Sequence, residues 1–241
     1  MKLKPFQEKL VFQGIPGKMY SLQQNLDIAL SKGKKQIIAF QSPTGTGKTV
    51  MLSKLIDFYR NQEVSFVWVG PSDGGLVFQS LDKVNKLVQL GLIFEDLSTE
   101  YIPQGQVLFI GWSQVNRISS EGFESKIMNN ESKDLPQVIS NTRSKRKLVV
   151  IVDESHIGAT KPSNSKEVLN TVFKADVEIH ISATNTSLDF ADYTTIVTQE
   201  MRDEIIDSGI IKKELKMGQL GVQGNDARKS HFFCGRDEKK S

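Results

Sequence analysis

Residues 36 to 58 constrain the fold of this chain more than any other part of its sequence. Residues 36 to 41 form a short run rich in Ile and Phe, which predicts a buried strand. Residues 42 to 49 read Ser-Pro-Thr-Gly-Thr-Gly-Lys-Thr and interrupt that run, and apolar residues then return at helical spacing as far as residue 58. A strand, a glycine-rich loop and a helix in this order predict one unit of an α/β fold.

Further apolar runs alternate with helical patterns along the rest of the chain. We predict strands at residues 64–69, 107–110, 148–152, 177–182 and 193–197, and helices at residues 18–32, 75–90 and 165–173. This alternation is typical of the doubly wound α/β class, in which helices cover both faces of a mainly parallel sheet. Ligands of such folds bind beyond the carboxyl ends of the strands, so we expect a functional site at that edge.

The 241 residues suffice for one large domain or two small ones. We expect one domain at residues 1–216. Within it, the polar residues 117–147 read as a surface insertion with a helix near residues 135–140. Residues 217–241 lose all periodicity and end in a run of charges, a composition that predicts disorder.

Composition limits where the protein works. The longest apolar runs have about five residues, whereas a membrane-spanning helix needs about 20. The amino terminus carries scattered charges instead of the apolar stretch of a secretory signal, and the single cysteine, Cys234, agrees with a reducing compartment. We therefore expect a cytoplasmic protein without a membrane part. Its net charge of +3 is compatible with binding to nucleic acid but does not require it.

The loop at residues 42–49 has the composition of a phosphate-binding loop. Its glycines let successive backbone amides turn toward phosphates, and the following helix adds its positive end. In such a loop Lys48 reaches the outer phosphates and Thr49 is a ligand of magnesium. The strict pattern has glycine where Ser42 stands, and a small residue there is a variant of it. The candidate binding residues are Thr44, Gly45, Thr46, Gly47, Lys48 and Thr49.

Two adjacent carboxylates follow the predicted strand at residues 148–152. A magnesium ion held only by Thr49 and phosphates would lack an anchored carboxylate. Asp153 can supply it through water, and Glu154 can polarise an attacking water molecule. The sequence thus places a candidate site for phosphate chemistry at the end of this strand.

Three motifs together resemble motifs I, II and III of superfamily 2 helicases and translocases. These are residues 44–49, Asp153-Glu154-Ser155-His156 and Ser182-Ala183-Thr184, which occur in that order and at similar spacing. Residues 3–7 resemble the segment whose glutamine reads adenine. Residues 69–72 together with residues 76–79 resemble motif Ia, which lies against a nucleic-acid strand. This set of motifs is most similar to the motifs of the motor subunit of type III restriction enzymes and of related DEAD/DEAH-box proteins.

The resemblance implies a RecA-like lobe that uses ATP and Mg²⁺ and binds nucleic acid, with DNA as the first expectation. It implies that Gln7, for which Gln13 is a rival, contacts adenine. It also implies two catalytic residues, Lys48, which binds the phosphates, and Glu154, which polarises the attacking water. Further implied roles are magnesium binding by Thr49 and Asp153, coupling by His156, Ser182 and Thr184, and nucleic-acid contact by Pro71 and Ser72.

The resemblance covers about residues 3–215, which correspond to one motor lobe, whereas helicases of this superfamily have two. In the family, arginines of the second lobe complete the ATP site and stabilise the charge of the transferred phosphoryl group. We therefore expect slow hydrolysis by this chain alone. A second chain could supply the other lobe, or a nuclease or methyltransferase.

Three functional classes remain open from sequence. The first is a nucleic-acid-dependent ATPase of helicase type, which the complete motif set favours. The second is a nucleotide-gated binding module or truncated motor with little or no hydrolysis. The third is an unrelated phosphate-loop enzyme such as a small-molecule kinase, which the motifs at residues 153–156 and 182–184 disfavour.

Overall fold

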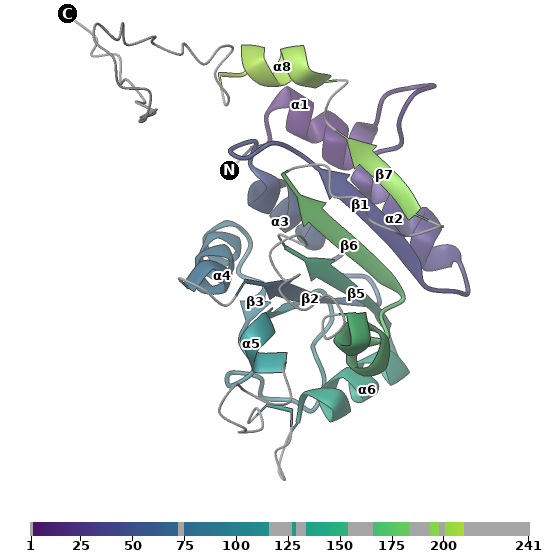
Figure 1. The fold of residues 1–241 in the computed structure, drawn as a ribbon, viewed down its shortest axis with the longest axis vertical. Helices are drawn as coiled ribbons and strands as arrows, with labels where there is room; N and C mark the ends of the chain where they lie inside the picture. The colour runs from purple at the N-terminus through teal and green to yellow at the C-terminus, as the bar shows by residue number, and fades with distance from the viewer. Residues whose placement is uncertain are drawn as a thin grey trace, which may run out of the picture.

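One parallel sheet forms the centre of the protein. The computed structural model describes residues 2–71, 75–115, 127–128, 134–153, 166–183, 193–197 and 201–209. Its strands are β1 Gln36–Gln41, β2 Val64–Gly70, β3 Gly91–Leu92, β4 Val107–Gly111, β5 Lys147–Val152, β6 Val177–Ser182 and β7 Tyr193–Val197. They lie in the order β3-β4-β2-β5-β6-β1-β7, and every neighbouring pair is parallel (Figure 1). The predicted doubly wound α/β class is confirmed.

Helices cover the sheet on both faces. They are α1 Pro5–Glu8, α2 Leu22–Ser31, α3 Lys48–Phe58, α4 Leu76–Leu87, α5 Trp112–Val115, α6 Leu135–Lys145 and α8 Arg202–Asp207, with π-helical turns η1 Lys9–Gln13 and η4 Leu169–Phe173. Alternate residues of the strands separate two cores. Val149 and Ile151 of β5 join the core under α1 to α4, whereas Val150 and Val152 join the core under α5, α6 and η4. Burial on both faces explains why β5 reads as an uninterrupted apolar run.

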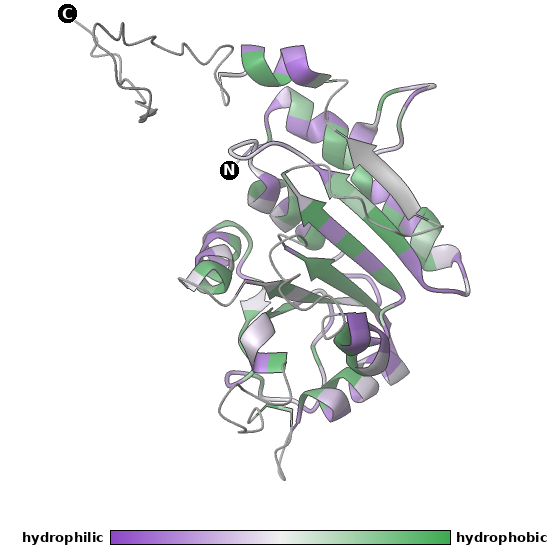
Figure 2. Ribbon diagram, viewed as in Figure 1, coloured by the Kyte–Doolittle hydropathy of each residue, from purple (hydrophilic) through white to green (hydrophobic). Residues whose placement is uncertain are grey.

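Strand β6 departs from that pattern. Figure 2 shows β5 as hydrophobic after its first residue, Lys147, whereas hydrophilic bands interrupt β6. Those bands include Glu178 and His180, which are 1% and 5% exposed. His180 Nε2 lies 2.9 Å from Glu178 Oε2, and Lys35 Nζ lies 2.5 Å from Glu178 Oε1. Burial alone would raise the pKa of the Glu178 carboxyl, but the hydrogen bonds and charges of His180 and Lys35 outweigh it and lower the pKa.

The predicted strand boundaries agree with the structure to within one residue, whereas the helix boundaries differ more. The predicted helix at residues 18–32 begins at Leu22, because Ser21 caps it through a hydrogen bond to the amide of Gln24. Met19 instead pairs with Ile15 in a turn.

The predicted surface segment at residues 117–147 contributes to the core in its described part. Helix α6 extends to Lys145, beyond the helix expected near residues 135–140. Leu135, Val138 and Ile139 of this helix are at most 1% exposed and join the second core. The wide polar face of α6 conceals this narrow apolar stripe in the sequence.

Helix α8 packs against the amino-terminal turn. Lys4 Nζ donates to the carbonyl oxygen of Ser208 at 2.7 Å, and Lys9 pairs with Glu204 at 2.9 Å. Ile205 is 1% exposed in the first core. In the described part of the chain, no helix has the length and apolar character needed to span a membrane.

Candidate active site

The loop between β1 and α3 has a backbone that favours glycine at two positions. Gly45 and Gly47 both have φ of +86°, a left-handed conformation that costs residues with a β carbon about 1 to 2 kcal/mol. A β carbon at Gly47 would also lie 2.6 Å from Nε2 of Gln7. The backbone conformation therefore favours glycine at position 47, and an added β carbon would also displace the Gln7 amide.

Buried hydroxyls hold this loop in shape. The Ser42 and Thr46 hydroxyl oxygens lie 2.6 Å apart, and Thr46 Oγ1 donates to the carbonyl oxygen of Pro43 at 2.8 Å. Both side chains are fully buried. Ser42, which replaces the glycine of the strict pattern, thus contributes a hydrogen bond to the loop.

Lys48 lies across the loop that it follows. Its Nζ donates to the carbonyl oxygens of Ser42 at 2.8 Å and Pro43 at 3.3 Å. Lys48 is also the first residue of α3, so the unpaired amides of the first helical turn begin here. A cation and a helix amino terminus together form an environment suited to phosphate.

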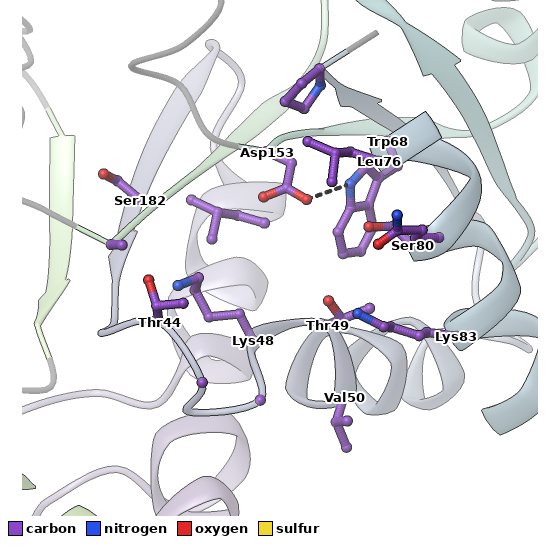
Figure 3. Close-up of a pocket in the computed structure, with 16 residues that line it drawn as sticks. Thr44, Lys48, Thr49, Val50, Trp68, Leu76, Ser80, Lys83, Asp153 and Ser182 are labelled. Atoms are coloured by element: carbon purple, nitrogen blue, oxygen red, sulfur yellow. Dashed lines mark hydrogen bonds between the residues drawn. The ribbon is translucent and has the colours of Figure 1, made fainter. Parts of the chain in front are cut away.

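A cavity of about 430 Å³ opens beside the loop, at the carboxyl ends of the strands. Of the candidate residues predicted from sequence, those that line it are Thr44, Gly45, Gly47, Lys48, Thr49, Pro71, Asp153 and Ser182. Figure 3 shows Asp153 facing the same space as Lys48 and Thr49. The structure therefore brings together residues from four predicted motifs that are far apart in the chain.

Asp153 is anchored to strand β2. Its backbone amide donates to the carbonyl oxygen of Val69 at 2.8 Å. One carboxylate oxygen accepts a hydrogen bond from the indole nitrogen of Trp68 at 3.2 Å. Sequence reasoning identified Asp153 but missed Trp68, because only the pairing of β2 with β5 makes them neighbours.

The end of β6 is joined directly to the phosphate-binding loop. The amide of Ser42 donates to the carbonyl oxygen of Ser182 at 3.1 Å, and Ser182 is 7% exposed. The candidate residues Ser72, Glu154, His156 and Thr184 lie outside the described residues.

Gln7 contacts the loop from the amino-terminal turn. Its Nε2 donates to the carbonyl oxygen of Thr46 and its Oε1 accepts from the amide of Lys4, both at 2.9 Å. It is 3% exposed, whereas its rival Gln13 is exposed on η1. Neither Gln7 nor Thr46 contributes to the lining of the cavity.

Helix α4 forms a wall of the cavity that the sequence predicts only in part, because residues 76–79 resemble motif Ia whereas no predicted motif contains Ser80 or Lys83. Leu76, Gln79, Ser80 and Lys83 line it, and Figure 3 shows Ser80 and Lys83 beside the space that Thr49 faces. These four positions have the i, i+3, i+4, i+7 spacing of one helix face. That spacing is present in the sequence and could have identified the cavity wall. The helix prediction used only the apolar residues of α4, which mark its buried face. The described lining contains two lysines and no arginine.

The donors in the cavity fit a magnesium ion shared with phosphates. Thr49 offers a hydroxyl and Asp153 a carboxylate, which are oxygen ligands of the kind that Mg²⁺ prefers. The described residues contain no group of three or more His, Cys, Asp or Glu side chains that could hold a metal alone. Phosphate and water oxygens would therefore complete the coordination.

Comparison with known proteins agrees with this geometry. Residues 3–187 match the family model described as type III restriction enzyme, res subunit. A search of curated proteins gave no match.

Several solved structures are similar to the chain, including the following two. A nuclease-deletion mutant of the Type ISP restriction-modification enzyme LlaGI, in complex with a DNA substrate mimic, is 15% identical with a TM-score of 0.50, covering 85% of this chain and 21% of that one. Dbp5 of S. cerevisiae, bound to RNA and ADP BeF3, is 19% identical with a TM-score of 0.40, covering 85% and 48%. This chain thus spans about a fifth of the LlaGI chain and about half of the Dbp5 chain.

Proposed function

This chain belongs to the family of the type III restriction enzyme res subunit, and from that premise we propose that it is the ATP-binding lobe of a helicase-type motor. We propose further that it hydrolyses ATP when it is bound to nucleic acid. One observation carries the proposal: Lys48, Thr49, Asp153 and Ser182 line a single cavity although they come from three separate segments.

Each side chain in the cavity has a role in this proposal. Lys48 leaves the carbonyl oxygens of Ser42 and Pro43 to bind the outer phosphates. Thr49 and Asp153 hold Mg²⁺, which neutralises charge on the phosphate oxygens when it is bound. Glu154, next to Asp153 in the chain, polarises the attacking water. Ser182 couples changes of the loop that accompany nucleotide binding and hydrolysis to β6, because its carbonyl oxygen accepts a hydrogen bond from the amide of Ser42.

We propose nucleic acid, and DNA in the first place, as the partner of this lobe. Pro71 follows β2 and lines the cavity, so a strand that contacts Pro71 and Ser72 would lie next to the nucleotide. Motor lobes that grip the sugar-phosphate backbone do not need to read bases. The similar LlaGI structure contains a DNA substrate mimic, which supports testing DNA before RNA.

We propose that hydrolysis by this chain alone is slow. Stabilising charge on a transferred phosphoryl group commonly requires an arginine, whose contribution is about a thousandfold or more. The cavity lining, as far as the structure describes it, holds Lys48 and Lys83 but no arginine. A second motor lobe, in another chain or elsewhere in a larger assembly, would supply it. A nuclease or methyltransferase is a further candidate partner.

Steady-state ATP hydrolysis with and without single- and double-stranded DNA and RNA tests the proposal. We expect slow turnover that DNA increases and that Lys48→Ala abolishes. Lys86→Ala is the matched control, because Lys86 lies on α4 outside the cavity lining and pairs with Asp82. Binding of ATP without any turnover would instead favour a nucleotide-gated binding module, and absence of ATP binding would reject the proposal.

A further inference from the structure

Trp68 contacts the carboxylate that we assign to magnesium. Its indole Nε1 donates a hydrogen bond of 3.2 Å to Asp153 Oδ2, drawn as a dashed line in Figure 3. Both residues line the cavity. They are 85 positions apart in the sequence and become neighbours because β2 pairs with β5. The contact is therefore a product of the fold and is not part of any local motif.

The indole ring is fixed by the core. Trp68 is 1% exposed and stacks on Phe109 of β4, with ring centroids 5.4 Å apart and an interplanar angle of 22°. The two residues are direct partners in the register of β2 and β4. A side chain packed in this way has little rotational freedom. The direction of its N–H bond is consequently set by packing before any ligand arrives.

Strand β2 holds Asp153 at two points. The carbonyl oxygen of Val69 accepts a 2.8 Å hydrogen bond from the backbone amide of Asp153, and the indole nitrogen of Trp68 donates one to the Asp153 carboxylate. The first bond fixes where the backbone of Asp153 lies, and the second restrains rotation of the carboxylate. A metal ligand that is already oriented loses less conformational entropy when the metal binds.

We propose that Trp68 is a positioning residue for the magnesium–nucleotide site: its indole N–H orients the Asp153 carboxylate for Mg²⁺. This rests on the proposed function, because it needs a site that binds Mg²⁺ together with a nucleotide. The hydrogen bond to a charged group is of the stronger kind, and its loss removes one restraint on the rotation of the carboxylate. Trp68 itself does not touch the phosphates in this assignment.

Isothermal titration calorimetry with a non-hydrolysable ATP analogue measures the effect without turnover. The quantity is the ratio of the dissociation constant in EDTA to that in Mg²⁺, which reports how strongly metal and nucleotide assist each other. Trp68→Phe keeps an aromatic ring against Phe109 but removes the N–H group. We expect it to lower this ratio by roughly three- to tenfold, and to change the dissociation constant in EDTA little.

Trp112→Phe is the matched control. Trp112 is the second tryptophan of the chain, and it is also buried, at 9% exposure. Its indole nitrogen has no hydrogen-bond partner within the described part of the structure. We expect this variant to keep the ratio of the parent protein. Phe109→Leu is a packing control, which removes the stacked ring but keeps the indole N–H. We expect it to lower the melting temperature and to reduce the ratio less than Trp68→Phe does.

The outcomes separate the two proposals. A parent protein that does not bind the analogue contradicts the proposed function, and this inference with it. A parent that shows a large ratio, and a Trp68→Phe variant with the same ratio, overturns the role of Trp68 alone. An equal loss in Phe109→Leu also overturns it, because packing would then explain the effect. If circular dichroism shows that Trp68→Phe is unfolded, benzothienylalanine at position 68 is the alternative, since it keeps the ring size and replaces N–H by sulfur. An unchanged ratio of dissociation constants in that variant would overturn the role of Trp68.

Discussion

The side-chain amide of Gln7 donates a 2.9 Å hydrogen bond to the carbonyl oxygen of Thr46, inside the phosphate-binding loop. The amino-terminal turn and the loop are separated by 39 positions, and both partners are buried. Removing one partner of a buried hydrogen bond leaves the other partner unsatisfied and lowers the stability of the fold. The amino-terminal turn is therefore a structural support of the loop, whatever it contributes to adenine recognition.

Replacing Gln7 by Ala should weaken both the fold and nucleotide binding. The carbonyl oxygen of Thr46 and the amide of Lys4 each lose a partner, so we expect the free energy of unfolding to fall by about 1 to 3 kcal/mol. Urea denaturation and titration with a fluorescent ATP analogue measure the two effects. Gln13→Ala is the control, since Gln13 is exposed. Equal behaviour of both variants would contradict this role of Gln7.

A series of glycine-to-alanine variants separates backbone strain from steric conflict. Gly47 combines φ of +86° with a contact of 2.6 Å, Gly17 has φ of +72° and no atom within 4 Å of an added β carbon, and Gly33 has neither constraint. We expect Gly33→Ala to be neutral and Gly17→Ala to cost about 1 kcal/mol. Gly47→Ala should cost more and reduce ATP affinity. Thermal denaturation and ATP titration check this order, which a harmless Gly47→Ala would refute.

The ion pair between Lys35 and Glu178, a buried residue of β6, should make the stability of the fold depend on pH. The pKa of Glu178 is lowered in the folded protein, so the pair stabilises the fold above the ordinary value of 4.5, and this contribution disappears as the pH falls through the lower folded pKa. Lys35→Met removes a cation that lowers this pKa. We therefore expect it to destabilise the protein at pH 7 and to flatten the loss of stability below pH 4.5.

Urea denaturation between pH 3 and pH 7 tests this expectation. Lys34→Met is the matched control, because Lys34 is exposed and adjacent in sequence, whereas Lys35 Nζ contacts Glu178. Identical pH profiles of the two variants would show that the buried pair does not determine this part of the stability.

Lys83 should contribute to nucleotide affinity although no motif contains it. It lies in the cavity wall formed by α4, on the side that Thr49 faces. A cation near triphosphate in a partly exposed site has a modest effect, so we expect Lys83→Ala to weaken ATP binding by about two- to fivefold. Lys86→Ala should bind as the parent does. A salt titration should show a smaller salt dependence for Lys83→Ala, and an unchanged affinity would remove Lys83 from the site.

Sequence patterns predicted the sheet well because its strands are buried on both faces. Residues 148–152 of β5 form a continuous apolar run, and the glycines and Lys48 identify the phosphate-binding loop in the sequence. Short elements were missed: the two-residue strand β3 and the six-residue helix α8 are too brief for a periodic pattern.

The parts of the site that depend on strand order could not be predicted. Trp68 meets Asp153, and Ser42 meets Ser182, only because β2 pairs with β5 and β1 with β6. A single sequence gives the strands but not their neighbours. Position 83 shows a different limit, because the apolar periodicity of α4 indicates its buried face and the cavity is lined by a neighbouring face.

Equilibrium binding of ATP in the presence of Mg²⁺ tests the central claim most directly, namely that the loop and Asp153 form one nucleotide site. The measurement compares the parent protein with Lys48→Ala, Asp153→Asn and the control Lys86→Ala. We expect saturable binding by the parent and the control, a loss of at least about tenfold in Lys48→Ala with or without Mg²⁺, and a loss in Asp153→Asn only when Mg²⁺ is present. Equal ATP affinity in all four proteins would contradict the account.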